Sequence, residues 1–312
     1  MIRYKIIVNP VSGWGLGERS VSQIEELFGH LGLEYDLART ERPWHAAHLA
    51  LQAAADGYDV VVAVGGDGTA NEVLNGLMMA KETSGKTCAM GMLSVGRGND
   101  FAFGVGVPKD LEKACQTLAQ GHRRLIDVGR VFGGDYPNGR FFGNGVGIGF
   151  DAVVGFEAAK MLHIRGLLSY LVAAIKTIYL YYQAPLVQIE YDQKTIQLAT
   201  LMISVMNGQR MGGGFMMAPR ANPGDGLLDV CIATQVSRSR IFGLIPHFLR
   251  GTQASQPEIM NLQASRLRVN ALQGNLPVHA DGETICTAGQ QLTIELLASQ
   301  IEMISQTAEA FK

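Results

Sequence analysis

The residues best suited to chemistry lie in segment 60–72, where an apolar run leads into glycines, one acid and a hydroxyl. The run Val60–Val64 consists of small or β-branched apolar residues, which is typical of a strand covered on both faces. The glycines of Gly65-Gly66-Asp67-Gly68-Thr69 let backbone amides approach a ligand without obstruction by side chains. This arrangement predicts a phosphate-binding turn.

Asp67 would repel phosphates bound beside it if its carboxylate carried no cation. The acid suits Mg²⁺, held directly or through water, with the cation bridging the phosphate oxygens. The alternative is an ordinary strand-to-helix turn in which Asp67 or Thr69 caps the helix. No Gly-Lys-Ser/Thr follows, so the segment is not a P-loop.

Two later segments also carry acids in patterns that suit a site. In 278–283, Asp281 and Glu283 flank a glycine, and in an extended strand residues two apart point to the same face. The alternative is a hairpin, because Asp-Gly is a frequent turn. Asp225 ends the glycine- and proline-rich stretch 212–225, and there the alternative is a turn acid before the strand at Leu227.

The N-terminal half alternates strands and helices at close spacing, which predicts a parallel sheet with helical crossovers. The expected strands are Tyr4–Val8, Leu33–Thr40, Val60–Val64 and Met90–Ser94, and the expected helices are Val21–Leu31, His45–Ala55, Asn71–Met79 and Asp110–Ala119. Asp110 is a plausible N-cap. Glycine-rich loops follow three of the strands, and such loops at carboxyl ends are where parallel α/β sheets bind ligands.

From about residue 130 short strand-like runs predict an all-β domain, a sandwich or an open barrel. These runs are Arg140–Val146, Val187–Tyr191, Thr200–Met206 and Gly226–Thr234. The exception is 156–182, the one long helical stretch, which is apolar and aromatic with interspersed cations, including His163 and Arg165. It fits a pair of helices packed on the sheet or a surface that meets anionic lipid.

Composition narrows the class of protein. The 312 residues are 47% hydrophobic and 17% charged with a formal charge of −2, which disfavours a general nucleic-acid binder. The four cysteines have no Cys-x-x-Cys spacing and suit reduced thiols in the cytoplasm. The N-terminus has no pattern of a signal peptide and no apolar run is long enough to span a bilayer, so we expect a soluble protein or one bound to a membrane surface.

The ordered motifs resemble the bacterial diacylglycerol kinases and related lipid kinases, relatives of sphingosine kinases and NAD kinases. The resemblance spans essentially the whole chain and rests on 9–13, 65–72, 98–101, 127–129, 147–151, 212–219, 225–229 and 281–283. It implies a Rossmann-like, three-layer α/β domain similar to those of NAD kinases and phosphofructokinases, over 1–129 and 296–312. It also implies a β-sandwich domain over 130–295 with a helical insertion at 156–182, and a site in the cleft between the two.

The resemblance also implies roles for single residues. Nucleotide contacts would come from Asn9, Thr40, Gly65, Gly66, Asp67, Gly68, Thr69, Asn71, Ser94 and Gly96. Catalytic Mg²⁺ would be bound by Asp67, Asp100 and Asp127, partly through water, and a structural Mg²⁺ by Asn222, Asp225 and Leu227. Asp281 would be the general base that accepts the lipid hydroxyl proton, oriented by Glu283.

The implied activity is an ATP-dependent lipid kinase that phosphorylates a free hydroxyl of a membrane lipid such as diacylglycerol, in phospholipid metabolism. Two alternatives stay open: a kinase of a soluble substrate similar to NAD kinase, and a non-catalytic regulator that binds lipid or nucleotide. Arg97 stands where many relatives carry threonine, which leaves the nucleotide preference open. ATP and lipid are the expected partners, with no nucleic acid; peripheral contact with the inner membrane surface and a homodimer are further expectations.

Overall fold

The computed structural model describes residues 2–96, 98–161, 166–180 and 182–306. The chain forms two compact units: one runs to Val128 and resumes at Ala298, and the other spans Gly129–Leu297. The chain passes between them inside two strands, β5 (Arg123–Gly133) and β15 (Gln291–Ile304). Arg97, His163 and Arg165, singled out in the sequence, lie outside the described residues.

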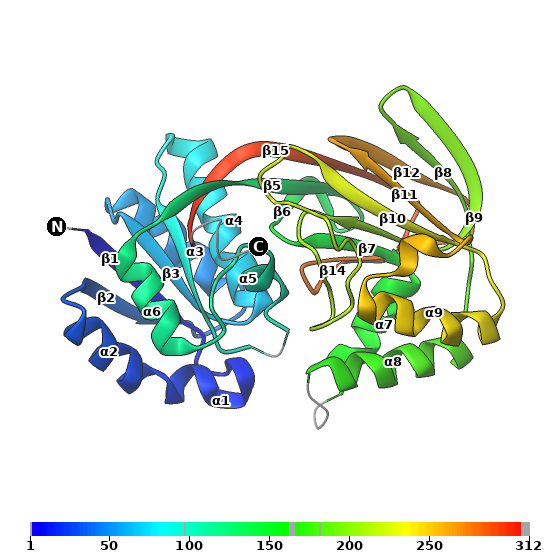
Figure 1. Ribbon diagram of the computed structural model, residues 1–312. Coiled ribbons are helices and arrows are strands. Elements are labelled where there is room, and N and C mark those ends of the chain that lie inside the picture. The colour runs from blue at the N-terminus through cyan, green and yellow to red at the C-terminus, as the bar shows by residue number, and fades with distance from the viewer. Residues whose placement is uncertain (1, 97, 162–165, 181, 307–312) are drawn as a thin grey trace. The chain divides into compact units, whose positions relative to one another are not determined.

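The first unit is built on a parallel sheet, as predicted. Its strand order is β2 (Glu34–Arg39), β1 (Arg3–Val8), β3 (Val60–Gly65), β4 (Ala89–Ser94) and the end of β15, and every neighbouring pair runs parallel. Every residue of β3 is buried, because helices cover both faces of the sheet (Figure 1).

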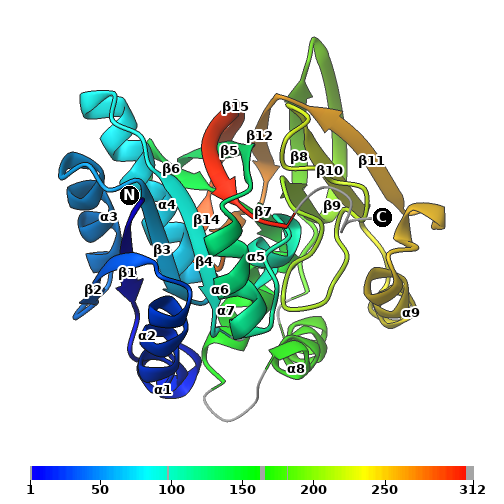
Figure 2. The same cartoon turned by 60° about the vertical axis from the view of Figure 1, so that its left-hand side comes forward.

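Two pairs of helices form the outer layers of this unit. On one face α2 (Val21–His30) and α6 (Leu111–Gln120) pack through Ile24, Phe28 and Leu118 against the strands. On the other, α3 (His45–Ala55) and α4 (Asp67–Ser84) lie side by side (Figure 2). Gly76 permits this close packing, since a Cβ there would lie 2.2 Å from the carbonyl oxygen of Ala47. As predicted, Asp110 caps α6 by accepting a hydrogen bond from the Lys113 amide.

Two helical boundaries differ from the sequence prediction. Helix α4 begins at Asp67, ahead of the predicted start at Asn71, after an extended Gly66. Part of the predicted loop 9–17 is α1 (Ser12–Arg19), which is interrupted by positive φ angles at residues 13–15. Glycines lower helix propensity, and only the surrounding fold decides where such a segment turns helical.

The second unit is antiparallel and sandwich-like. Its remaining strands are β6 (Tyr136–Phe142), β7 (Gly145–Gly149), β8 (Leu186–Tyr191), β9 (Lys194–Met206), β10 (Leu228–Thr234), β11 (Ile259–Ala264), β12 (Arg266–Gln273), β13 (Leu276–Ala280) and β14 (Glu283–Gly289). Alternating apolar residues of these strands meet in one core that includes Phe142, Ile203 and Val278. The predicted strand 140–146 is instead broken at residues 143 and 144, between β6 and β7.

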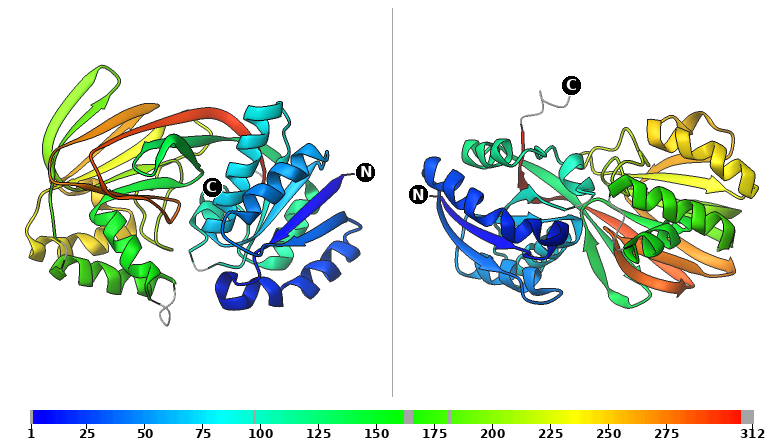
Figure 3. Two further views of the ribbon diagram at one scale, coloured as in Figure 1. Left: turned by 180° about the vertical axis from the view of Figure 1, so that it is seen from behind. Right: turned by 90° about the horizontal axis from the view of Figure 1, so that it is seen from below.

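Three helices lie along one side of these strands: α7 (Phe150–Ala159), α8 (Gly166–Leu180) and α9 (Arg238–Arg250) (Figures 1 and 3). A short 3₁₀ turn, η1 (Gln253–Ser255), follows α9. The sequence prediction missed α9, whose Pro246 and many cations obscured the helical spacing of Ile241, Leu244 and Phe248. Among the described residues, no helix has the length and apolar character to cross a bilayer.

The helix pair α7 and α8 carries a buried carboxylate that predicts a dependence of stability on pH. Glu157 is 3% exposed and accepts hydrogen bonds from Lys160 and Lys176, which lower the pKa of its carboxyl. Because the pKa is lower in the folded state, this stabilisation is present above the unfolded-state pKa of about 4.3 and is lost as the pH falls through the folded-state value. We expect Glu157→Gln to lower the Tm at pH 7 and to differ little from wild type in strong acid.

Thermal unfolding of both proteins across this pH range measures the effect. Glu26→Gln, on the exposed face of α2, is the matched control and should follow wild type throughout. An equal Tm difference at every pH would contradict a role for the charge of Glu157.

Candidate active site

Two glycine-rich segments meet at the carboxyl ends of β3 and β4 in the first unit. The Val95 amide donates to the Gly65 carbonyl oxygen at 2.9 Å, and a Cβ on Gly96 would lie 2.2 Å from the Gly66 Cα. A Cβ on Gly65 would lie 2.3 Å from Thr69 Oγ1. No larger residue fits at these positions without moving the backbone, so the glycines are required by packing as well as by access.

The start of α4 presents amide groups at this edge. Asp67, Gly68 and Thr69 form its first turn, and neither Asp67 nor Thr69 is the N-cap, because that position is taken by Gly66 without a side-chain cap. The interpretation of this turn as a simple side-chain cap is therefore wrong. The amides of the first turn and the helix dipole at such a terminus favour phosphate.

Other predicted nucleotide contacts come from the neighbouring strand ends. Asn9 follows β1, and its Nδ2 donates to Thr69 Oγ1 at 3.0 Å. Thr40 follows β2 and is held by its amide, which donates to the Val8 carbonyl oxygen at 2.8 Å. Ser94 Oγ at the end of β4 is buried and has no hydrogen-bond partner among the described residues. A buried hydroxyl in this state is a candidate for a ligand contact.

Asn71, another predicted nucleotide contact, is buried within the packing of the helices. Its side chain is 0% exposed, and its carbonyl and Oδ1 both accept hydrogen bonds from Asn75 one turn further along α4. Burial inside the helix packing favours a structural role for Asn71 rather than the predicted contact with nucleotide.

Two of the three predicted metal-binding acids converge. A Cβ on Gly98 would lie 2.9 Å from Asp67 Oδ2 and 3.3 Å from Asp100 Oδ2, so both carboxylates approach the same glycine. The loop is held by Asp67 Oδ1, which accepts a hydrogen bond from the Phe101 amide at 3.0 Å. Asp127 is 1% exposed and accepts a hydrogen bond from the Ser299 amide at 2.7 Å.

The donor chemistry of this edge fits a hard cation, because carboxylate oxygens are preferred Mg²⁺ ligands. The acids do not form a set of three direct ligands, however: in the part of the chain that the structure describes, no group of three His, Cys, Asp or Glu residues could hold a metal. Two carboxylates completed by water and phosphate oxygens fit the usual Mg²⁺ coordination.

Glu72 is a positioning residue that the sequence analysis did not assign. Its two oxygens accept hydrogen bonds from the amides of Trp44 and Ala46, at 2.8 and 3.0 Å. Trp44 precedes α3 with a φ of +67°, and Glu72 supplies the acceptor that this helix start lacks in its own side chains. The carboxylate thereby joins α4 to the segment after Thr40.

In the second unit, residues 280–283 form a tight hairpin. Ala280 pairs with Glu283, and Asp281 and Gly282 have φ angles of +48° and +86°. Positive φ at both central residues is typical of a type I′ turn. The hairpin predicted from Asp-Gly is therefore confirmed, and the extended backbone that would place Asp281 and Glu283 on one face is not formed.

Asp281 is 7% exposed and bound on both oxygens. Its Oδ2 accepts from the Gly143 amide at 2.7 Å, and its Oδ1 accepts from the amides of Asn144 and Gly145 at 3.0 and 2.9 Å. The first two amides belong to the break between β6 and β7, and the third is that of the first residue of β7. Glu283, in contrast, is exposed at the start of β14.

The predicted structural metal site lies in the exposed turn before β10. The Asn222 carbonyl oxygen accepts from the Gly224 amide at 2.7 Å, and Asp225 Oδ1 accepts from the Leu227 amide at 3.0 Å. Asp229 is an additional acid here: burial raises the pKa of its carboxyl, and the nearby charge of Asp225 raises it further. Its Oδ2 is buried without a hydrogen-bond partner in the described chain, so a cation beside Asp225 and Asp229 would suit the electrostatics.

Comparison with known proteins links both units to kinases. The profile of the "Diacylglycerol kinase catalytic domain" matches residues 3–131, and that of the "YegS C-terminal NAD kinase beta sandwich-like domain" matches 144–304. A protein of Bacillus subtilis named diacylglycerol kinase is 30% identical over 285 residues, which cover 91% of this chain and 90% of that protein. A diacylglycerol kinase of Mycobacterium tuberculosis is 26% identical and covers 95% of this chain and 93% of its own length.

A solved structure agrees with the fold. A crystal structure described as a diacylglycerol kinase from Bacillus anthracis superposes with a TM-score of 0.74 at 21% identity, covering 98% of this chain and 97% of that chain. At this level of identity the superposition bears on architecture, and it confirms the predicted combination of an α/β unit with a β-sandwich-like unit.

Proposed function

This chain belongs to the diacylglycerol kinase family and is a kinase, and we propose that it transfers the γ-phosphate of ATP to a free hydroxyl of a membrane lipid such as diacylglycerol. The observation that carries the proposal is the close approach of Val95 and Gly96 to the 65–69 turn, with Asp67 and Asp100 converging at Gly98. Phosphoryl transfer needs positioning and charge neutralisation more than covalent catalysis, and this edge offers both.

The nucleotide is bound mainly by backbone. Amides at the start of α4 donate to phosphate oxygens, and the glycines at 65, 66, 68 and 96 allow the close approach. Asn9 orients Thr69, Thr40 borders the same edge, and the free Ser94 hydroxyl donates to the ligand.

Two magnesium sites follow from the donor sets. Asp67 and Asp100, with Asp127 through water, would hold the ion at the phosphates, where it would neutralise the charge of the transferring group. Asn222, Asp225 and Leu227 would hold the second, and Asp229 adds a carboxylate with an unpartnered oxygen.

We assign the proton acceptor to Glu283 and a positioning role to Asp281, the reverse of the roles implied by the resemblance. Three backbone amides occupy the Asp281 carboxylate and fix its orientation, whereas the exposed Glu283 carboxylate keeps its lone pairs available. The lipid oxygen bonds to the γ-phosphorus, the bond to the bridging β–γ oxygen breaks, ADP leaves, and Glu283 accepts the hydroxyl proton.

Transfer of labelled γ-phosphate from ATP into an organic extract tests the proposal, with diacylglycerol, ceramide, sphingosine and phosphatidylglycerol as acceptors. We expect a phosphorylated lipid that appears only with Mg²⁺. A protein silent on all four lipids, or one that forms NADP from NAD and ATP, would overturn the lipid assignment.

The exposed side of α8 fits the lipid surface that such a substrate requires. Leu168, Ile175 and Tyr179 are 60%, 44% and 63% exposed, and Tyr179 lies 6.0 Å from the ring of Phe242 on α9. Lys160 and Lys176 both pair with Glu157, which leaves this cluster with one net positive charge to complement anionic headgroups. We propose that this strip contacts an anionic bilayer.

Replacing Ile175 and Tyr179 together by glutamate should weaken binding to phosphatidylglycerol vesicles by about tenfold or more, because two apolar contacts are lost and two charges oppose the surface. Vesicle sedimentation measures this. Leu272→Glu, an equally non-conservative change at a 45% exposed leucine of β12, is the control and should bind as wild type does. Equal binding by all three proteins would exclude the strip as the contact.

A further inference from the structure

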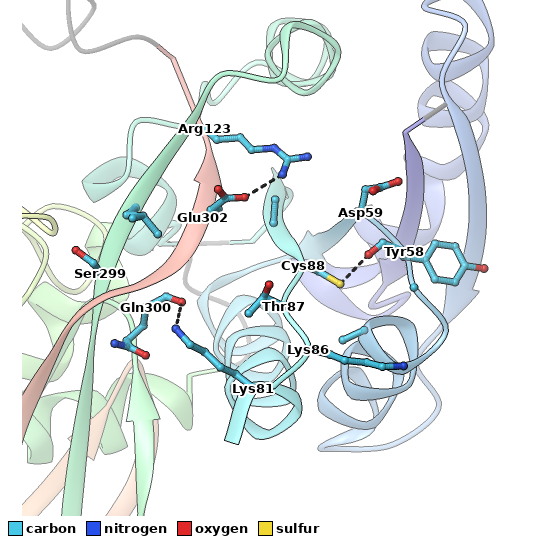
Figure 4. A pocket seen from close by; sticks show the side chains of 14 residues that line it. Tyr58, Asp59, Lys81, Lys86, Thr87, Cys88, Arg123, Ser299, Gln300 and Glu302 are labelled. Atoms are coloured by element: carbon cyan, nitrogen blue, oxygen red, sulfur yellow. Dashed lines mark hydrogen bonds and ion pairs between the residues drawn. The ribbon is translucent and has the colours of Figure 1, made fainter. Parts of the chain in front are cut away.

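A pocket of about 570 Å³ lies in the first unit at the edge opposite to the nucleotide turns. Its walls come from the amino ends of β3 and β4, the last turns of α3 and α4, the start of β5 and the final part of β15 (Figure 4). Since a strand rises about 3.3 Å per residue, the six residues of β3 separate the two edges by about 17 Å. The pocket is therefore a separate site, and its volume is in the range of small-molecule pockets.

The charged groups in its wall are Lys81, Lys86, Arg123, Asp59 and Glu302. Arg123 and Glu302 form an ion pair at 2.9 Å and offset each other. Asp59 accepts a hydrogen bond from the Arg3 amide at 2.8 Å, and the Arg3 guanidinium lies 4.4 Å from the ring of Tyr58, another wall residue. With three cations and two acids, the wall carries a net positive charge of one.

Both lysines retain donors for a ligand. Lys81 Nζ donates to the Gln300 carbonyl oxygen at 2.8 Å, and Lys86 Nζ donates to the Ala55 carbonyl oxygen at the end of α3. An ammonium group has three N–H donors, so each lysine has further donors beyond these bonds. The hydroxyl of the exposed Thr87, the residue after Lys86, adds a neutral donor to the wall.

One wall residue of the pocket is hydrogen-bonded to Asp127, one of the predicted metal-binding acids. Ser299 lines the pocket with a φ of +54°, and its amide donates to Asp127 Oδ1 at 2.7 Å. The next residue, Gln300, is the acceptor of Lys81. A ligand that binds Lys81 therefore acts on Gln300, which is next to Ser299, the residue whose amide donates to Asp127.

We propose that this pocket binds a small organic phosphate, such as a phosphate monoester, and that occupancy stabilises the Ser299–Asp127 hydrogen bond. Two ammonium groups and a hydroxyl, from α4 and the loop between α4 and β4, suit a tetrahedral dianion with several acceptor oxygens, and the volume leaves room for an attached organic group. The binding step is independent of the kinase activity; only the effect on Asp127 rests on the proposed function.

Calorimetric titration of the full chain with glycerol 3-phosphate and with inorganic phosphate, without nucleotide or lipid and at constant ionic strength, tests the binding step. We expect saturable binding of the ester that Lys81→Gln with Lys86→Gln weakens by about tenfold or more. The control Lys109→Gln with Lys113→Gln removes the same charge from exposed positions near the start of α6 and should bind as wild type does.

Thr87→Trp fills the pocket without changing charge and should also weaken binding, so the test does not depend on the lysine variant alone. Thermal unfolding without ligand verifies that each variant is folded. Hydrogen exchange of the Ser299 amide should slow when the ester is bound. No saturable binding by wild type, or equal binding by the wild type, the lysine variant and the tryptophan variant, would overturn the site; unchanged exchange at Ser299 would overturn the coupling.

Discussion

Asp67→Asn is expected to lower kcat/KM for lipid phosphorylation by about a thousandfold, because it removes a charge from the acids that face the transferring phosphate. The fold should be retained. Asparagine Oδ1 can still accept the hydrogen bond that the Phe101 amide donates to Asp67, so the contact between Phe101 and the start of α4 survives.

Steady-state kinetics with ATP and a lipid acceptor measure the loss, and Tm values verify folding. Asp110→Asn is a matched control because it also removes a carboxylate at a helix start of the same unit while keeping a capping acceptor. The variant should retain wild-type activity. An Asp67→Asn enzyme with near-normal kcat/KM would contradict a metal-binding role for this acid.

The second large expected effect distinguishes the role of Glu283 from the role of Asp281. Glu283→Gln should lower kcat by about a hundredfold or more, because the amide cannot accept the hydroxyl proton. Its Tm should stay unchanged, since the side chain is exposed at the start of β14. Asp281→Ala should instead lower the free energy of unfolding by about 3 kcal/mol or more, because three buried amides lose their acceptor and alanine disfavours positive φ.

Denaturant unfolding and the dependence of kcat on pH distinguish these roles. In Glu283→Gln the proton acceptor is lost, so the fall of kcat at acid pH should disappear. In a variant of Asp281 whose effect is only structural, the folded molecules should show the same fall of kcat at acid pH as wild type. If Asp281→Asn proved fully stable but inactive, with Glu283→Gln fully active, the original assignment of the base to Asp281 would be restored.

Much of the first unit follows from the local pattern of the chain. Five consecutive apolar residues before Gly65, helical spacing in 21–31 and the alanines of 45–55 each predict one element, and their alternation predicts a parallel sheet. The glycines at 65, 66, 68, 96 and 98 mark the edge that we expect to bind a ligand, since the carboxyl ends of parallel strands share one edge.

The features that the sequence analysis missed or misjudged depend on contacts between distant segments. The division of 140–146 into β6 and β7 depends on Asp281, more than 130 positions away, which binds the amides exposed by the break. The role of Glu72 depends on the start of α3, and the hydrogen bond of Asp127 depends on Ser299. None of these residues carries a local signal of its partner.

The sequence by itself determined the fold class, the family and the position of the turn that we propose binds phosphate, because periodicity and glycine spacing act over a few residues. Only the tertiary structure decided between a hairpin and an extended backbone at residues 280–283, and only it showed that Asn71 is buried and that a cationic pocket forms at the opposite edge of the sheet. The physical reason is that burial and hydrogen-bond partners are properties of the packed chain, and Lys81 and Gln300 become neighbours only after folding.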